Sequence, residues 1–335
     1  MSKQGQALEQ AFHGEPAVWL KWGAYEAAVL PAVGANLIAF RDIEKGYHFL
    51  HEPAEGEMAA FKARPGTHGI PVLFPPNRYQ DGTFTMNGKT YTFPINEPNT
   101  GNHLHGFVHT AAWKVLDYGT LKTESYVLLQ IAVDEQHPIY TYLPHRFAIT
   151  LRYSLNDQGL FQHISVHNRG NDAMPCLIGF HTAINAPFAP QSTSGDYSFT
   201  LTAGKRWELD ERMLPTGQFQ PLSSNEEKLK TTGASPYFEP LDNHYTVETR
   251  NGRNQMELTD AREQVTLVYD AGTAYKQWMV WNSNASGQFF CPEPQLNLVN
   301  APNVNLPADE IGLVSLEPNG IWEETSRLYV KPAAK

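Results

Sequence analysis

The architecture of this chain is indicated most clearly by residues 84–93, which read Phe84-Thr85-Met86-Asn87-Gly88-Lys89-Thr90-Tyr91-Thr92-Phe93. Apolar and polar side chains alternate on both sides of the Asn-Gly pair. Such a pair accepts the two positive φ angles of a type I′ turn, whose twist matches that of paired strands. The stretch therefore predicts an antiparallel β-hairpin.

The same two-residue period recurs along much of the chain. Further short runs rich in β-branched and aromatic residues predict strands over Val127–Val133, Phe147–Leu155, Phe161–Asn168, Ser198–Ala203, Val265–Tyr269, Trp278–Trp281 and Leu313–Leu316. Residues 156–159, Asn-Asp-Gln-Gly, predict a turn between two of these strands. Helical signals occupy two short stretches, 2–12 and Ser223–Lys230, and Ser223 is a candidate N-cap of the second.

Strands without regularly alternating helices argue against a doubly wound parallel sheet. More than about ten strands must split or curl into packed sheets. We therefore expect an all-β protein, with residues 1–335 forming one domain. Its expected architecture is a large antiparallel β-sandwich with few short helices.

The composition restricts the partners of the protein. The chain has 335 residues, of which 41% are hydrophobic and 18% charged, and this balance is typical of a globular protein. Its 25 basic and 35 acidic residues give a formal net charge of −10, which disfavours nucleic acid and anionic membrane surfaces. Neutral small molecules are therefore the favoured ligands.

No targeting or membrane-spanning segment is evident in the sequence. Residues 1–12 lack the apolar run of a signal peptide, and the most apolar stretch, Ala27–Phe40, is interrupted by proline and glycine. The two cysteines, Cys176 and Cys291, form no CxxC pair and are expected to be reduced, buried thiols. These features favour a cytoplasmic protein.

Two segments in the first third of the chain carry candidate site residues. Asn77 and Arg78 follow two prolines that fix a rigid path, and the planar guanidinium of arginine suits bidentate recognition of oxygen atoms. His103 and His105 point to the same face of an extended segment. Their spacing is compatible with zinc, but no further ligands are evident. A surface arginine and structural histidines are the alternative interpretations.

Two later segments offer an acid and a base. His181 follows the apolar run 176–180, a position from which an imidazole can serve as a general acid. Glu293 lies between Pro292 and Pro294 after an apolar run, and such surroundings raise the pKa of a carboxyl group toward the range of a useful base. A core histidine and a solvated turn glutamate are the alternatives.

Taken in order, these segments resemble the aldose 1-epimerase family of the galactose mutarotase superfamily. The matching pieces span residues 70 to 305. They are Asn77-Arg78 with Asp81-Gly82-Thr83-Phe84, Asn87-Gly88-Lys89-Thr90-Tyr91, Asn102-His103-Leu104-His105-Gly106, Trp113-Lys114-Val115, His181, Leu241-Asp242-Asn243-His244-Tyr245, and Glu293-Pro294-Gln295 with Asn303.

The resemblance implies a β-sandwich that interconverts the α and β anomers of a free sugar held in a groove on one face. It implies Glu293 as the general base at the C1 hydroxyl and His181 as the general acid at the ring oxygen. Substrate contacts are expected from Arg78, His105, Asp242, His103 and Asn77, with His103 alternatively acting through His105. The implied isomerase requires neither a metal nor a cofactor, and we expect a monomer or homodimer.

Three other functions remain open. His105-Gly106-Phe107 resembles the hexose-6-phosphate 1-epimerase branch, which needs extra cations, and Arg64, Lys62 and Lys114 are the candidates. A non-catalytic carbohydrate-binding protein on the same fold is a second alternative. The third is a glycoside hydrolase or lyase that uses paired carboxylates such as Asp242 and Glu293. Phe74, Phe107 or Trp281 could present an apolar platform to a sugar.

Overall fold

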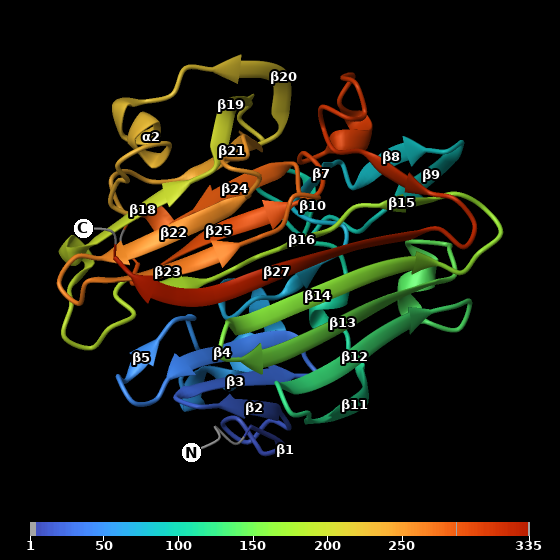
Figure 1. The fold of residues 1–335 in the computed structure, drawn as a ribbon. Helices are drawn as coiled ribbons and strands as arrows, with labels where there is room; N and C mark the ends of the chain where they lie inside the picture. Colours follow the sequence, from blue (N-terminus) through green and yellow to red (C-terminus); the bar gives the residue numbers. More distant parts are fainter. Residues whose placement is uncertain (1–4, 286, 334–335) are drawn as a thin grey trace.

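Two eight-stranded antiparallel sheets pack together in the computed structural model, which describes residues 5–285 and 287–333 (Figure 1). The strands of the first sheet, in spatial order, are β11 (Lys114–Thr120), β12 (Ser125–Val133), β13 (Phe147–Asn156), β14 (Gly159–Asn168), β27 (Ile321–Pro332), β23 (Val265–Asp270), β22 (Gln255–Asp260) and β18 (Tyr197–Leu201). The long strand β27, red in Figure 1, joins the sequence-consecutive half β11–β14 to the other half.

The second sheet carries the candidate site. Its order is β20 (Pro215–Gln220), β19 (Ala203–Leu209), β21 (Asp242–Val247), β24 (Gln277–Trp281), β25 (Phe289–Gln295), β16 (Gly179–Phe180) and β6 (Val72–Leu73), with β17 (Ile184–Asn185) also paired to β25. Neighbouring strands of this sheet therefore come from widely separated parts of the chain.

The remaining strands form smaller sheets around this pair. A five-stranded sheet comprises β1 (Gln6–Glu9), β2 (Val18–Trp22), β3 (Tyr25–Leu30), β4 (Asn36–Asp42) and β5 (Tyr47–His48). Two-stranded pairs are formed by β7 (Arg78–Gln80) with β10 (Asn102–Leu104), β8 (Thr83–Met86) with β9 (Lys89–Thr92), and β15 (Met174–Cys176) with β26 (Val314–Leu316).

Helices of the described residues are short. The α-helices are α1 (Met58–Ala63) and α2 (Ser224–Leu229), and the 3₁₀ turns are η1 (Glu55–Glu57), η2 (Pro65–Thr67), η3 (Val108–Thr110), η4 (Pro138–Thr141), η5 (Ser194–Asp196), η6 (Ser283–Ala285) and η7 (Ala301–Asn303). No helix in the described part of the chain has the length and apolar character needed to cross a lipid bilayer.

The core between the large sheets follows from the alternation of side chains along each strand. The Phe199 ring of β18 lies 4.9 Å from that of Phe290 in β25, and the Tyr269 ring of β23 lies 6.3 Å from that of Trp278 in β24. Since Trp278 and Phe290 face this core, Met279 and Glu293 face the opposite side of the second sheet. That side is where polar residues collect.

The all-β prediction is confirmed, and so is the hairpin of residues 84–93. Thr85 pairs with Thr90 and Met86 with Lys89, while Asn87 and Gly88 have φ angles of 53° and 73°. Each of the other predicted strand runs overlaps a strand, although Ser198–Ala203 is divided between β18 and β19.

The two helical predictions have opposite outcomes. Helix α2 is confirmed, with the Ser223 hydroxyl accepting a hydrogen bond from the Glu226 N–H in a capping box. The helical turn expected over 2–12 is wrong for its described part, because Gln6–Glu9 form β1 instead. A helix of this length is marginally stable alone, whereas pairing with β2 places these residues in a five-stranded sheet.

Gly106 offers a test of how tightly the site-bearing loop is packed. A Cβ atom at Gly106 would lie 2.2 Å from the Phe74 carbonyl oxygen, whereas one at Gly88 would have nothing within 4 Å. Both glycines have positive φ angles, 64° and 73°. Alanine is strained by the positive φ at both positions, but only at Gly106 does its Cβ atom also clash with neighbouring backbone. Gly106→Ala should therefore destabilise the protein by about 1–3 kcal/mol more than Gly88→Ala. Urea unfolding of both variants measures this difference, and equal unfolding midpoints would contradict the packing described here.

Candidate active site

A cavity of about 630 Å³ opens on the polar face of the second sheet. Six of the seven predicted site residues line it, namely Asn77, Arg78, His105, His181, Asp242 and Glu293. They come from the β7 region, the loop after β10, the segment after β16, and strands β21 and β25. The fold therefore brings together residues that are dispersed over the sequence.

Strand register fixes the floor of this cavity. Glu293 of β25 lies opposite Met279 of β24, and Met279 lies opposite His244 of β21. The neighbouring row contains Asp242 and Trp281. Because residues two apart share a face, both carboxylates project from the same side of the sheet.

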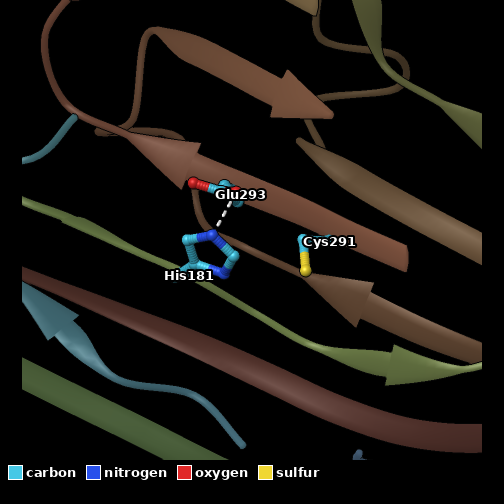
Figure 2. A group of neighbouring side chains, drawn as sticks. All are labelled: His181, Cys291 and Glu293. Atoms are coloured by element: carbon cyan, nitrogen blue, oxygen red, sulfur yellow. Dashed lines mark ion pairs between the residues drawn. The ribbon is translucent and has the colours of Figure 1, made fainter. Parts of the chain in front are cut away.

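Glu293 and His181 form a buried pair at the floor (Figure 2). His181 Nε2 lies 3.2 Å from Glu293 Oε1, and the Glu293 side chain is fully buried. The Gln295 amide donates a hydrogen bond of 3.3 Å to Glu293 Oε2. An acid and a base thus stand within proton-transfer distance, as general acid–base chemistry requires.

Burial disfavours charge on both members of the pair. Desolvation, reinforced by the negative charge of Asp242, raises the pKa of Glu293 well above 4.5. Desolvation, reinforced by His109, lowers the pKa of His181 to about 3. Because the two groups are in contact, they titrate as one unit, and a single exchangeable proton on the carboxyl group keeps the pair neutral.

Arg78 supplies a fixed positive charge in the cavity wall. Its Nε donates to both carboxylate oxygens of Glu97, at 3.1 and 3.0 Å, and one terminal nitrogen donates to Asp242 at 3.3 Å. Burial opposes the charged form, but the Asp242 and Glu97 carboxylates outweigh it and raise the pKa of Arg78 above its ordinary value. The guanidinium is therefore both charged and oriented.

The backbone at Asn77 and His105 is held in an uncommon conformation. Their φ angles are 57° and 69°, and the His105 N–H donates a hydrogen bond of 2.9 Å to the Asn77 carbonyl. Left-handed backbone at a histidine is unfavourable and is often found at functional sites. The Asn77 side chain also accepts a hydrogen bond of 2.9 Å from the Arg78 N–H.

The imidazoles around the cavity are neutral. Burial, with smaller effects from nearby imidazoles and Arg78, lowers the pKa of His105 well below 6.5. Burial likewise lowers the pKa of His109 to about 4. Neutral rings can accept hydrogen bonds from sugar hydroxyls as well as donate them.

His103, the seventh predicted residue, lies outside the cavity lining. Its Nδ1 lies 2.7 Å from the Pro94 carbonyl oxygen, and its ring centre lies 5.0 Å from that of Phe93 and 4.9 Å from that of Phe107. This placement does not support the predicted substrate contact. His103 instead lies behind His105, whose pKa it helps to lower.

One of the three suggested aromatic platforms lines the cavity, and it is Trp281. Phe74 is buried with its ring 5.4 Å from Phe147, and Phe107 stacks on Tyr142 at 4.6 Å. Trp281 also lies 6.1 Å from the His181 ring. An apolar surface therefore borders the acid–base pair on one side.

Three features of the site are not predicted from the sequence. Glu97 accepts hydrogen bonds from Arg78 and holds its guanidinium in place. The one sequence signal for Glu97 is its position in the segment that leads to His105. Met279 also lines the cavity, as do Ala63, Gly66 and Thr67 beside the candidate cation Arg64. These apolar or small residues have no distinctive chemistry, so only the three-dimensional contacts identify them.

The buried carboxyl group predicts a pH-dependent stability difference for Glu293→Gln. Below pH 4.5 the carboxyl is protonated in folded and unfolded chains, and burial costs little extra. As the pH rises above that value, only the unfolded chain ionises freely, so the wild type loses stability. Glu293→Gln should avoid this loss, and its advantage should grow by at most about 1.4 kcal/mol per pH unit.

Denaturant unfolding at several pH values between 4 and 9 measures this difference. Glu317→Gln, at an exposed carboxylate, is the matched control for the removal of one negative charge. A Glu293→Gln advantage that stays constant across this range would contradict a raised pKa at Glu293.

Comparison with known proteins identifies the family of the chain. The family model described as aldose 1-epimerase matches residues 16–329. The crystal structure of a galactose mutarotase-like protein from Clostridium acetobutylicum superposes with a TM-score of 0.94 at 31% identity, covering 99% of both chains. The uncharacterized protein YihR of Escherichia coli (strain K12) is 28% identical over 256 residues, which are 75% of this chain and 74% of that protein.

Galactose mutarotase from Homo sapiens is 26% identical over 147 residues, which correspond to 44% of this chain and 40% of the human protein. A putative aldose 1-epimerase from Escherichia coli K12 shares the fold at a TM-score of 0.72 and 16% identity, over 98% of this chain and 100% of that one. With a family model that spans nearly its whole length, this chain belongs to the aldose 1-epimerase family.

Proposed function

We propose that the protein is a mutarotase that interconverts the α and β anomers of a free aldohexose without a cofactor. The observation that carries this proposal is the buried contact of 3.2 Å between Glu293 and His181 at the floor of a polar cavity. The cavity volume of about 630 Å³ is within the roughly 300–1,000 Å³ typical of small-molecule sites.

In this mechanism, the exchangeable proton of the pair passes from the Glu293 carboxyl to His181 as the sugar binds, and the Glu293 carboxylate then takes the proton of the C1 hydroxyl. The C1–O1 bond becomes a carbonyl as the bond between C1 and the ring oxygen breaks, and His181 delivers a proton to that ring oxygen. Rotation about the C1–C2 bond then presents the other face of the aldehyde. Ring closure reverses both proton transfers, so the two residues exchange their roles and the pair returns to its starting protonation.

The remaining wall residues support this chemistry. Arg78 directs positive charge toward oxygen atoms that become more negative as the ring opens. His105 and Asp242 offer hydrogen-bonding groups for sugar hydroxyls, and one oxygen of Asp242 is buried without a partner. Trp281 offers its ring to the apolar C–H face of the sugar.

Loss of either acid–base residue should slow the reaction strongly. We expect Glu293→Gln and His181→Asn each to lower kcat by about 10²–10⁴-fold, because each removes one proton-transfer group. Optical rotation of freshly dissolved α-D-galactose and α-D-glucose follows the reaction directly. His163→Asn is the matched control, since His163 lies on β14 of the first sheet with an exposed side chain and does not line the cavity.

Three results would refute parts of this proposal. Full activity in Glu293→Gln would exclude Glu293 as the base. Sugar binding by the wild type without faster mutarotation would favour a non-catalytic carbohydrate-binding protein. Release of new reducing ends from an oligosaccharide would favour a glycoside hydrolase.

Arg64 favours a phosphorylated hexose as a second candidate substrate. Among the described residues, its guanidinium has no ion-pair or hydrogen-bond partner, and Arg64 lines the cavity. Of the other two candidate cations, Lys62 pairs with Glu15 at 2.9 Å and Lys114 lies on β11 of the first sheet. An unpaired arginine at the wall of a sugar site is suited to an anionic substituent.

Arg64→Gln separates the two substrates. If the natural substrate is phosphorylated, this variant should lower kcat/KM for glucose 6-phosphate by about 10–100-fold, the value of a charge-assisted hydrogen bond. The kcat/KM for free glucose should stay unchanged. Lys62→Gln is the control for loss of a neighbouring positive charge, and an equal effect of Arg64→Gln on both sugars would refute the phosphate contact.

A further inference from the structure

A third polar side chain accompanies the acid–base pair. Cys291 and Glu293 lie two residues apart on β25 and share a face, and His181 approaches them from the segment after β16 (Figure 2). One ligand atom from each residue can be chosen so that all three lie within 4.8 Å of one another. All three side chains are buried.

Apart from the contact between His181 and Glu293, these side chains leave ligand atoms unused within the described structure. His181 Nδ1 is buried without a hydrogen-bond partner, and Glu293 Oε1 contacts His181 Nε2 at 3.2 Å. Cys291 is a free thiol. Buried polar atoms normally have partners, so unpartnered atoms that border a cavity point to a ligand.

We propose that Cys291, His181 and Glu293 together bind a thiophilic divalent cation such as Zn²⁺, and that this ion inhibits the enzyme. An imidazole nitrogen, a sulfur and a carboxylate oxygen form a donor set that zinc favours, with a fourth tetrahedral position left for water or a sugar oxygen. Zinc–ligand bonds of about 2.0–2.3 Å require the three atoms to approach by roughly 1 Å, which side-chain rotation can supply.

Zinc binding at this site releases protons from its ligands. Zinc binds the thiolate and the carboxylate, so the thiol proton of Cys291 and any proton on Glu293 are released to solvent while the sulfur and the carboxylate oxygen each donate an electron pair to the metal.

The inhibitory role rests on the proposed function, whereas the binding site itself does not. A bound ion would occupy the lone pairs that Glu293 and His181 need for proton transfer. It would also stand at the cavity floor, since both residues line the cavity. Zinc and sugar should consequently compete.

Cobalt binding tests the site without reference to activity. Titration of the purified protein with Co²⁺ should produce a thiolate-to-metal charge-transfer band in the near ultraviolet. Cys291→Ala should abolish the band. Cys176→Ala should retain it, because Cys176 is a buried free cysteine on β15 and pairs with Val314 rather than with the site strands.

Inhibition is measured on the same proteins by optical rotation. Zn²⁺ should raise the apparent KM for the sugar, and Mg²⁺, which prefers oxygen ligands, should not. Cys291→Ala should keep the basal rate while raising the inhibitory zinc concentration at least ~10-fold, since even outer-shell changes weaken metal sites by that factor.

Different results would refute the proposed metal site and the proposed mutarotase activity. A cobalt band that is absent from the wild type, or that persists in Cys291→Ala, would overturn the metal site. Equal zinc sensitivity of wild type and Cys291→Ala would do the same. A wild type that shows the cysteine-dependent band but does not accelerate mutarotation would retain the metal site and refute the mutarotase.

Discussion

Strand β25 contributes to the apolar core and to the candidate site at the same time. Its alternating side chains must complete the apolar core on one face and supply a carboxyl group to the cavity on the other. Phe290 meets Phe199 across the core, while Glu293 meets His181 on the opposite side. A one-residue change of register would exchange these faces and lose both functions together. The neighbouring strands β24 and β16 hold β25 in register on either side.

The low polarity that this packing creates determines the chemistry of the site. Burial raises the pKa of Glu293 and lowers the pKa of His181, so the empty pair is uncharged. A neutral pair is less costly to bury than two separate ions, and its proton can pass in either direction as a sugar binds. Arg78, in contrast, keeps its charge because two carboxylates contact it. The site therefore combines one fixed charge with one movable proton.

The period of the sequence predicts most of the strands because alternation is a local property. Residues 84–93 and the capped helix α2 are local in the same sense, and both are confirmed. Residues 6–9 show the limit of prediction from local sequence, since their pairing with β2 depends on a partner that no local pattern reveals. Prediction of the candidate site has the same limit. Chemically distinctive residues such as Arg78 and Glu293 can be identified, but the burial of His103 away from the cavity depends on tertiary packing.

Unpartnered polar atoms connect the proposed catalysis with the proposed metal site. A structure optimised for stability alone would give every buried donor and acceptor a partner. Here His181 Nδ1 and one oxygen of Asp242 are left without one, and Glu293 Oε1 contacts only the neutral ring of His181 among the described residues. A sugar with several hydroxyl groups can satisfy such atoms when it binds, and this gain favours binding over an empty cavity. The same free lone pairs are available to a metal ion. Because the Cys291 thiol lies beside them, the site favours a thiophilic ion. The unpartnered polar atoms that favour sugar binding therefore also explain the proposed inhibition by zinc.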